Sequence, residues 1–271
     1  MSFDRIAPDR AATLEGIARA AGDLAKRYFL GRDDLVIETK RSLTDMVSIA
    51  DREVEDLIRA ELHKAFPADG ILGEEYGLEA GTSGMTWVVD PIDGTAPFLN
   101  GLPGWCVSIG LMDENGPILG AIYAPMLGEM FIGGKGLPTT LNGKSVRVTE
   151  RFDLRSGLLA TGSNDRVSAE RIGRWHGDMA AAEVAWVRYS TGALMLAYVA
   201  AGRVVGFCEP RMSLWDCLAA YALIEAAGGR IMPFGAGAME GKPFPVLGAT
   251  HKDYDRIAAI CDFDDPAWVK A

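Results

Sequence analysis

The stretch WVVDPIDGT, residues 87–95, joins an apolar run to a tight turn that carries two carboxylates. Pro91 fixes one backbone torsion at the end of a predicted strand, and Gly94 permits the turn. Asp90 and Asp93 therefore converge, and such a pair repels unless a cation neutralises it. Oxygen ligands without a nearby His or Cys favour Mg²⁺, Ca²⁺ or Mn²⁺ over zinc. Taken alone, Asp-x-x-Asp beside Pro and Gly is equally typical of a plain loop.

Two further acidic stretches stand where a strand ends or a helix begins. Glu74 follows the apolar run Ile71-Leu72, and Asp216 lies in Ser213-Leu214-Trp215-Asp216 at the start of a predicted helix. Each has an ordinary interpretation, a solvated loop for Glu74 and a helix capping box for Asp216. With Asp90 and Asp93, however, they occupy the places where α/β proteins build sites.

Helical and strand patterns alternate around these residues. Apolar spacings of three and four predict helices over 9–29 and 54–66, with an extended piece over 36–40 between them. Short apolar runs then predict strands at 71–72, 87–89, 107–109, 118–123, 130–132 and 146–148. Further on, strands at 158–160, 184–187, 204–207 and 246–247 alternate with helices over 168–181, 192–201, 213–227 and 253–262. We expect a mixed α/β protein with an N-terminal α+β lobe, 1–152, and a C-terminal α/β lobe, 153–271, in one compact unit.

The composition is that of an ordinary globular protein. The 271 residues are 49% hydrophobic and carry a formal charge of −10. A chain of this length buries a substantial core. The acidic balance argues against nucleic acid or an anionic membrane as a partner, because both favour a basic surface. Any anionic substrate must therefore be held locally.

Cysteine and histidine usage argues against a structural zinc site. The four cysteines form no CxxC pair, and the three histidines form no HExxH motif.

The longest apolar run, 193–201, is far shorter than the roughly 18 residues of a membrane span. The first ten residues mix both charge signs and do not resemble a signal peptide. These features predict a reduced, cytoplasmic protein.

One more motif resembles a nucleotide-binding P-loop but is incomplete. Gly143-Lys144-Ser145 resembles the end of a P-loop, but Pro138 stands where that motif needs a glycine. Asn142-Gly143 instead predicts a hairpin turn.

The motifs together resemble the inositol monophosphatase family, within the lithium-sensitive, metal-dependent phosphomonoesterases. They are Lys40–Asp51 (KRSLTDMVSIAD), Gly73-Glu74-Glu75, Trp87–Thr95, and Trp215-Asp216 followed by Gly228-Gly229, in this order over nearly the full chain. The resemblance implies an αβαβα layered sandwich of two closely packed lobes, as in inositol monophosphatase and fructose-bisphosphatase. It also implies a homodimer.

The resemblance further implies a magnesium cluster of two or three ions. Its ligands are Glu74, Asp90, the Ile92 carbonyl, Asp93 and Asp216, with Lys40 behind them. The catalytic residues are Glu74, Asp51, Asp93 and Thr95, of which Asp51 and Thr95 orient the attacking water. The substrate contacts are Gly94, Thr95, Thr191, Glu209 and Asp216, and amides at Gly94 and Thr95 offer donors to a phosphate if they open a helix.

The chain departs from the family pattern beside these residues. Ala96-Pro97-Phe98 stands where the family commonly has Thr-Asn-Phe, and Ser190-Thr191-Gly192-Ala193 where it often has Gly-Thr-Ala-Ala. Glu209 matches a position that accepts hydrogen bonds from substrate hydroxyls, although a surface acid is the ordinary alternative. Arg188 faces the substrate, a dimer partner or solvent.

The leading functional hypothesis is Mg²⁺-dependent hydrolysis of a small phosphorylated metabolite, inositol monophosphate above all. Gly101-Leu102-Pro103 favours histidinol phosphate as an alternative, whereas Trp215 before Asp216 favours the inositol branch. Nucleotide 3′-phosphatase and fructose-bisphosphatase activities also occur on this scaffold. A different class, a regulatory binding protein in RNA metabolism, is disfavoured by the complete ligand set and by the acidic charge.

Overall fold

The computed structural model describes residues 7–31, 37–39, 46–164, 166–189 and 191–263. Their helices are α1 (Ala7–Leu30), α2 (Ile49–Ala65), α3 (Thr95–Leu99), α4 (Ala169–Ala181), α5 (Gly192–Ala200), α6 (Leu218–Ala226) and α7 (Tyr254–Cys261), with a 3₁₀ turn at Ala238–Glu240. None of these helices is long and apolar enough to cross a membrane.

Two sheets form the framework. In spatial order, the eight-stranded sheet contains β10 (Lys144–Ser145), β9 (Leu137–Leu141), β8 (Glu129–Gly134), β7 (Gly116–Ala124), β6 (Cys106–Asp113), β5 (Thr86–Asp93), β3 (Gly70–Gly73) and β4 (Gly77–Glu79). The five-stranded sheet contains β12 (Ala185–Val187), β11 (Leu158–Thr161), β13 (Gly206–Met212), β15 (Phe244–Ala249) and β14 (Arg230–Ile231). The short strands β1 (Ile37–Thr39) and β2 (Met46–Ser48) pair with each other.

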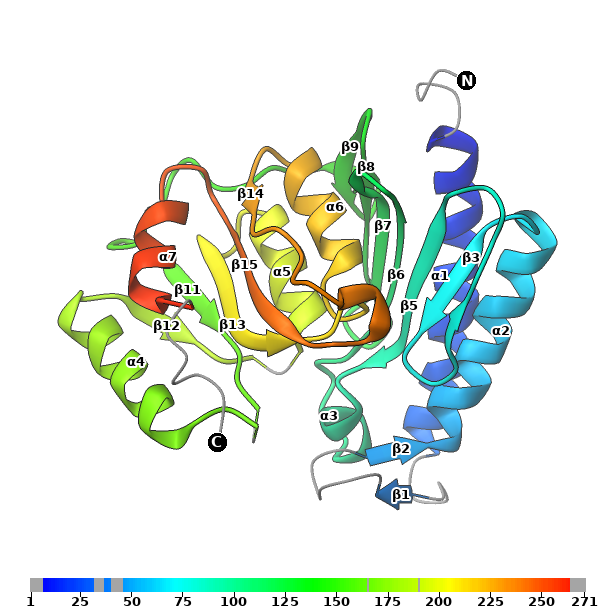
Figure 1. The fold of residues 1–271 in the computed structure, drawn as a ribbon, viewed down its shortest axis with the longest axis horizontal. Coiled ribbons are helices and arrows are strands. Elements are labelled where there is room, and N and C mark those ends of the chain that lie inside the picture. The colour runs from blue at the N-terminus through cyan, green and yellow to red at the C-terminus, as the bar shows by residue number, and fades with distance from the viewer. Residues whose placement is uncertain (1–6, 32–36, 40–45, 165, 190, 264–271) are drawn as a thin grey trace.

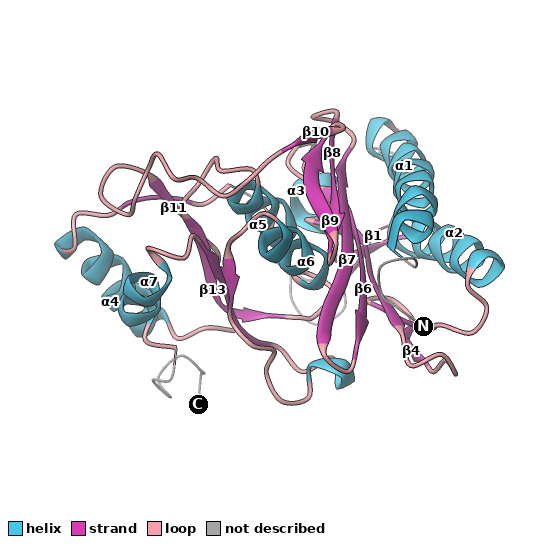
Figure 2. Ribbon diagram, turned by 90° about the horizontal axis from the view of Figure 1, so that it is seen from above, coloured by secondary structure: helices cyan, strands magenta, loops and turns pink. Residues whose placement is uncertain are grey.

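The elements stack in five layers, which Figures 1 and 2 show from two directions. Helices α1 and α2 cover the outer face of the large sheet, α5 and α6 fill the space between the sheets, and α4 and α7 cover the outer face of the small sheet. Three hydrophobic clusters fill the four interfaces between helices and sheets, because one cluster includes both faces of the central helical layer. This arrangement confirms the predicted mixed α/β class and the αβαβα sandwich.

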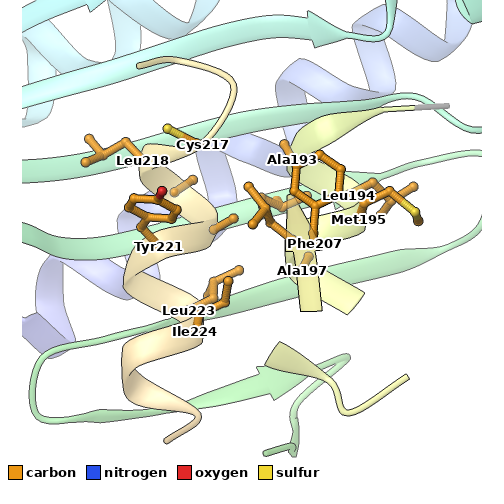
Figure 3. Close-up of a cluster of buried hydrophobic side chains, with 14 of the residues drawn as sticks. Ala193, Leu194, Met195, Ala197, Phe207, Cys217, Leu218, Tyr221, Leu223 and Ile224 are labelled. Atoms are coloured by element: carbon orange, nitrogen blue, oxygen red, sulfur yellow. The ribbon is translucent and has the colours of Figure 1, made fainter. Parts of the chain in front are cut away.

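The central layer positions the later elements of the site. Apolar side chains of α5, α6 and β13 face one another in this layer (Figure 3). Helix α6 lies directly on the large sheet, because a Cβ on Gly120 would come within 2.0 Å of the Ala219 carbonyl oxygen. Any larger residue at Gly120 would push α6 away from β7, and the loop before α6 would move with it.

The structure differs from the sequence-based elements in several places. Residues 146–148 are not a strand, and the last strand of that region is β10, two residues earlier. Helix α6, predicted over 213–227, begins at Leu218, after a turn over 214–217. The pattern missed the short elements β4, β9, β14 and α3. The Asn142-Gly143 hairpin is confirmed, since both residues have positive φ and join β9 to β10.

A buried carboxylate ties the start of the chain to the large sheet. Asp69, 6% exposed, accepts hydrogen bonds from the Trp87 indole nitrogen at 3.0 Å and from the Ser83 hydroxyl at 2.7 Å, and it forms an ion pair with Arg10. Removing one partner of a buried ion pair leaves the other charge uncompensated.

We expect Asp69→Ala to lower the free energy of unfolding by about 3–5 kcal/mol in urea denaturation. The matched control is Asp255→Ala, which removes the exposed ion pair with Arg230 and should cost less than about 1 kcal/mol. Equal losses in the two variants would show that the Asp69 network does not hold α1 in place.

Candidate active site

Four elements deliver carboxylates to one place. Strand β5 ends in Asp90 and Asp93, Glu74 follows β3, Asp51 lies in the first turn of α2, and Asp216 lies in the turn before α6. The parallel pairing of β3 with β5 brings their ends together, and the Glu74 amide donates to the Val89 carbonyl at 3.2 Å. These acids thus meet at a strand-end edge of the large sheet.

Asp90 is the centre of this group. Burial raises its pKa well above the ordinary value, and four neighbouring carboxylates raise it further: Glu74, Asp93, Asp216 and Asp51, in decreasing order of effect. Asp90 itself is 2% exposed, and its Oδ1 accepts a hydrogen bond from the Ile92 amide at 3.0 Å. Four acidic side chains therefore act on a fifth that is buried, which is unfavourable unless protons or cations neutralise them.

The first turn of α5 holds Asp93. The Ala193 amide donates to its Oδ2 at 2.8 Å, and the Cys106 thiol donates to the same oxygen at 3.8 Å. Burial raises the pKa of Asp93 to about 6, although these donors and the Thr191 hydroxyl favour the charged form. Asp93 therefore connects the end of β5 with the central helical layer.

Asp216 has a similar environment on the opposite side. Burial and the charge of Asp93 raise its pKa to about 7, while hydrogen bonds from the Ser213 amide and the Asp90 side chain lower it. The Ser213 amide lies 2.9 Å from its Oδ2, as the capping-box interpretation predicts. The Ser108 hydroxyl donates to the Trp215 carbonyl at 3.3 Å and ties this turn to β6.

The turn after β5 requires its glycine. Gly94 has φ of 98°, and a Cβ at this position would lie 2.4 Å from the Thr191 methyl group. The short helix α3 opens at Thr95, whose hydroxyl lies 3.4 Å from the Ile92 carbonyl oxygen. Gly94 and Thr95 thus lie between Asp93 and Thr191, and a role for either in phosphate binding stays a prediction.

The donor set fits a hard cation by its chemistry. All the candidate ligands are oxygens, and the raised pKa values of Asp90, Asp93 and Asp216 reflect charges that a cation would neutralise. Within the described ranges, no three His, Cys, Asp or Glu side chains are already grouped as a finished metal site. Asp90, Asp93 and Asp216 each accept a hydrogen bond from a backbone amide on one oxygen, and an ionised carboxylate has further lone pairs that can bind a cation.

A polar cavity of about 190 Å³ adjoins the acids. Asp93, Asp216, Thr191 and Glu209 line it, so two of the predicted ligands lie beside two of the predicted substrate residues, whereas Gly94 and Thr95 are not among the lining residues. Burial, and next the charge of Asp216, raise the pKa of Glu209 to about 8, whereas Arg188 lowers it. Glu209 is thus a partly buried acid that lines the cavity.

Two arginines line the same cavity. Arg188, which the sequence left open between substrate, dimer partner and solvent, lies at the cavity and donates to the Ser163 carbonyl at 2.7 Å. The sequence analysis missed Arg211, although its place two residues after Glu209 in a strand was a usable signal. It also missed Asn164 and the Cys106 thiol, which no motif marks. Lys40 lies outside the described residues.

The raised pKa values predict how the metal-free protein responds to pH. Asp93 and Asp216 take up protons near pH 6 and 7 in the folded state but near pH 4 when unfolded. The folded state then binds more protons, so stability falls as pH rises between about 4 and 7. We expect EDTA-treated protein to lose at least about 1 kcal/mol of unfolding free energy from pH 5 to pH 8, measured with urea. Asp216→Asn should flatten this slope, and a wild-type slope of opposite sign would contradict the electrostatic description.

Comparison with known proteins identifies relatives of this chain. The model of the inositol monophosphatase family matches residues 9–261. The Nus factor SuhB of Xylella fastidiosa is 36% identical over 80% of this chain and 79% of that protein. An inositol-1-monophosphatase of Mesorhizobium japonicum is 40% identical over 71% and 74%, and a histidinol-phosphatase of Chlorobaculum parvum is 36% identical over 82% and 84%.

Solved structures have the same architecture. The crystal structure of the extragenic suppressor protein suhB from Bartonella henselae superposes with a TM-score of 0.84 at 31% identity, covering 94% of this chain and 98% of that one. The similarity therefore extends through all five layers and both sheets.

Proposed function

The chain belongs to the inositol monophosphatase family, and from this premise we propose that it is a Mg²⁺-dependent phosphomonoesterase acting on a small polyol phosphate such as inositol monophosphate. Relatives named as inositol and histidinol phosphatases support the general activity. The observation that carries the proposal is the placement of four acids that raise the pKa of a fifth, Asp90, beside a cavity that Glu209 and Thr191 line.

We assign the metal to the acids at the end of β5. Glu74, Asp90, Asp93, Asp216 and the Ile92 carbonyl would hold two or three Mg²⁺ ions. The chemistry that Mg²⁺ supplies in such a site is polarisation of the phosphate oxygens and acidification of the attacking water. The oxygen-only donor set and the raised pKa values support this assignment.

The remaining residues position the reactants. Asp51 and the Thr95 hydroxyl orient the attacking water, beside the carboxylate of Glu74. The fixed turn at Gly94 holds Thr95 against the Ile92 carbonyl, so the hydroxyl is placed before substrate binds. Lys40, from the motif that contains Asp51, is assigned a supporting role on the family resemblance alone.

At the other end of the cavity, Glu209 and Thr191 contact the organic part of the substrate. Burial is the main cause of the raised pKa of Glu209, and Asp216 and Asp93 add to it; a cation on these two ligands would lower the pKa of Glu209. A carboxylate at this place can accept hydrogen bonds from two substrate hydroxyls.

Glu209→Gln tests this contact. The amide has one acceptor oxygen and a misplaced donor group, so we expect inositol 1-phosphate to lose about 1.5–3 kcal/mol of kcat/KM, the range for a hydrogen bond to a charged group. Glu240→Gln, an exposed acid outside the cavity, is the matched control and should leave kcat/KM unchanged. If both variants changed kcat/KM equally and only slightly, the assignment of Glu209 to the substrate site would be wrong.

A second candidate is histidinol phosphate. The histidinol-phosphatase relative and the Gly101-Leu102-Pro103 turn favour it. The two arginines at the cavity disfavour its ammonium group. Wild-type kinetics with Mg²⁺ on inositol 1-phosphate and histidinol phosphate separate the two, and we expect the inositol ester to be preferred. A tenfold preference for histidinol phosphate would overturn the polyol assignment and leave the phosphatase assignment standing.

Other properties are proposed on indirect grounds. Four buried free cysteines support a reducing compartment such as the cytoplasm, and the family resemblance supports a homodimer of two-lobed chains, with lobes 1–152 and 153–271. The Nus factor names favour a regulatory role in RNA metabolism as a different class of function. A pull-down at physiological salt tests that role, and we expect no retained RNA from a chain of charge −10.

A further inference from the structure

Side chains of both charge signs line the cavity. Asp93 and Asp216 line it on the side of the acidic cluster, whereas Arg188 and Arg211 also line it and belong to neither the cluster nor its hydrogen-bond partners. A neutral polyol needs no cation in its binding cavity. In a chain with a formal charge of −10, two guanidinium groups on one small cavity provide a local positive region.

Strand β13 brings Arg211 to the cavity. Side chains two residues apart in a strand point to the same face, so Arg211 lies on the face of Glu209, and both line the cavity. The pairing of β13 with β15 shifts register between Glu209 and Met212, and this bulge lets Met212 line the cavity as well.

The Arg211 side chain is not used by the protein itself. Its Nε is buried without a hydrogen-bond partner, and within the described ranges its guanidinium forms no hydrogen bond or ion pair. Only the Arg211 backbone carbonyl is engaged, accepting from the Asn164 side chain at 2.9 Å. A buried donor without a partner is unfavourable, and a guanidinium is suited to bind carboxylate or phosphate through paired N–H groups.

We propose that Arg211 binds a second anionic group on the substrate, so that the preferred substrate is a polyol phosphate with a carboxylate or another phosphate away from the ester that is hydrolysed. This inference rests on the proposed phosphatase function and narrows its substrate class. Arg188, fixed on the Ser163 carbonyl, adds positive charge beside the same position. Glu209 accepts hydrogen bonds from the substrate hydroxyl groups that lie between the two anionic groups.

The test uses substrates that differ only at the far end. Gluconate 6-phosphate carries a carboxylate where glucitol 6-phosphate carries a hydroxymethyl group, and each has a single phosphate to release. We expect the wild-type kcat/KM to favour gluconate 6-phosphate by about tenfold or more, the lower end for a hydrogen bond to a charged group. In Arg211→Gln this ratio should fall to about one, with the loss for gluconate 6-phosphate appearing in KM.

Two further variants and a second pair make the result specific. Arg211→Lys keeps the charge and should retain part of the preference. Arg166→Gln removes an exposed arginine outside the cavity and should leave the ratio unchanged. Fructose 1,6-bisphosphate against fructose 1-phosphate asks whether a phosphate serves as well as a carboxylate.

The outcomes separate this inference from the proposed function. Hydrolysis of both members of each pair with equal kcat/KM in the wild type would overturn the inference and leave the phosphatase function intact. A preference that survives Arg211→Gln unchanged would assign the anion to another residue and overturn it too. Failure to hydrolyse inositol 1-phosphate and all four of these esters with Mg²⁺ would overturn the proposed function, and the inference with it.

Discussion

Asp93→Asn is expected to lower kcat/KM for inositol 1-phosphate by at least about a thousandfold, corresponding to about 4 kcal/mol of transition-state stabilisation. Asp93 is the acid that connects β5, the proposed metal ligands and the cavity. The amide has no charge and one acceptor oxygen, so it binds a cation more weakly. The measurement is steady-state phosphate release at saturating Mg²⁺.

The same substitution should leave the fold intact. Burial raises the pKa of Asp93 to about 6, so the ionised carboxylate is a source of repulsion in the metal-free protein above that pH. We therefore expect metal-free Asp93→Asn to unfold in urea at the same concentration as wild type or higher at pH 8. Asp178→Asn on the exposed face of α4 is the control and should change neither quantity. Full activity in the Asp93 variant would contradict the cluster assignment.

Thr95→Ala is expected to reduce kcat by roughly 10²–10⁴ with little change in KM. Thr95 is the first residue of α3, and its hydroxyl lies 3.4 Å from the Ile92 carbonyl oxygen. A group that orients water acts mainly in the transition state, and its loss appears in kcat. Measuring kcat and KM separately on inositol 1-phosphate distinguishes this role from a simple phosphate contact.

Thr95→Ser provides the matched control, because it keeps the hydroxyl and loses only a methyl group. We expect it to retain most of the wild-type kcat. A change confined to KM in Thr95→Ala would make Thr95 a phosphate-binding residue. Equal losses in both variants would point to packing of α3 as the cause.

Periodic burial made much of the fold predictable. The helices α1 and α2 present one apolar stripe to the large sheet, and the apolar runs of β5, β6 and β7 are buried on both faces, so their patterns are strong. The pattern failed at residues 146–148, where the Val148 amide donates to the Ala227 carbonyl at the end of α6 instead of to a strand. Apolar residues in such a connection are buried by tertiary contacts, which a local pattern does not distinguish from strand burial.

The candidate site was predictable only where strand ends and turns determine it. Asp90 and Asp93 follow from the strand and the Gly94 turn, which predict that the two carboxylates lie close together. Glu74 and Asp216 needed the family resemblance, since each alone suits a loop or a helix cap. Alternation along β13 places Arg211 on the face of Glu209, but Met212 also lines the cavity because of a bulge that arises from pairing with β15, more than thirty residues later. A sequence read locally contains no signal for that register shift.

The central claim is that the acids around Asp90 hold the Mg²⁺ on which phosphate-ester hydrolysis depends. The most direct measurement is phosphate release from inositol 1-phosphate by EDTA-treated protein, back-titrated with Mg²⁺, for wild type and Asp93→Asn side by side. The account predicts no release before Mg²⁺ is added, saturable recovery in the wild type, and no comparable recovery in the variant. Equal release in EDTA and in Mg²⁺, or full recovery in Asp93→Asn, would contradict it.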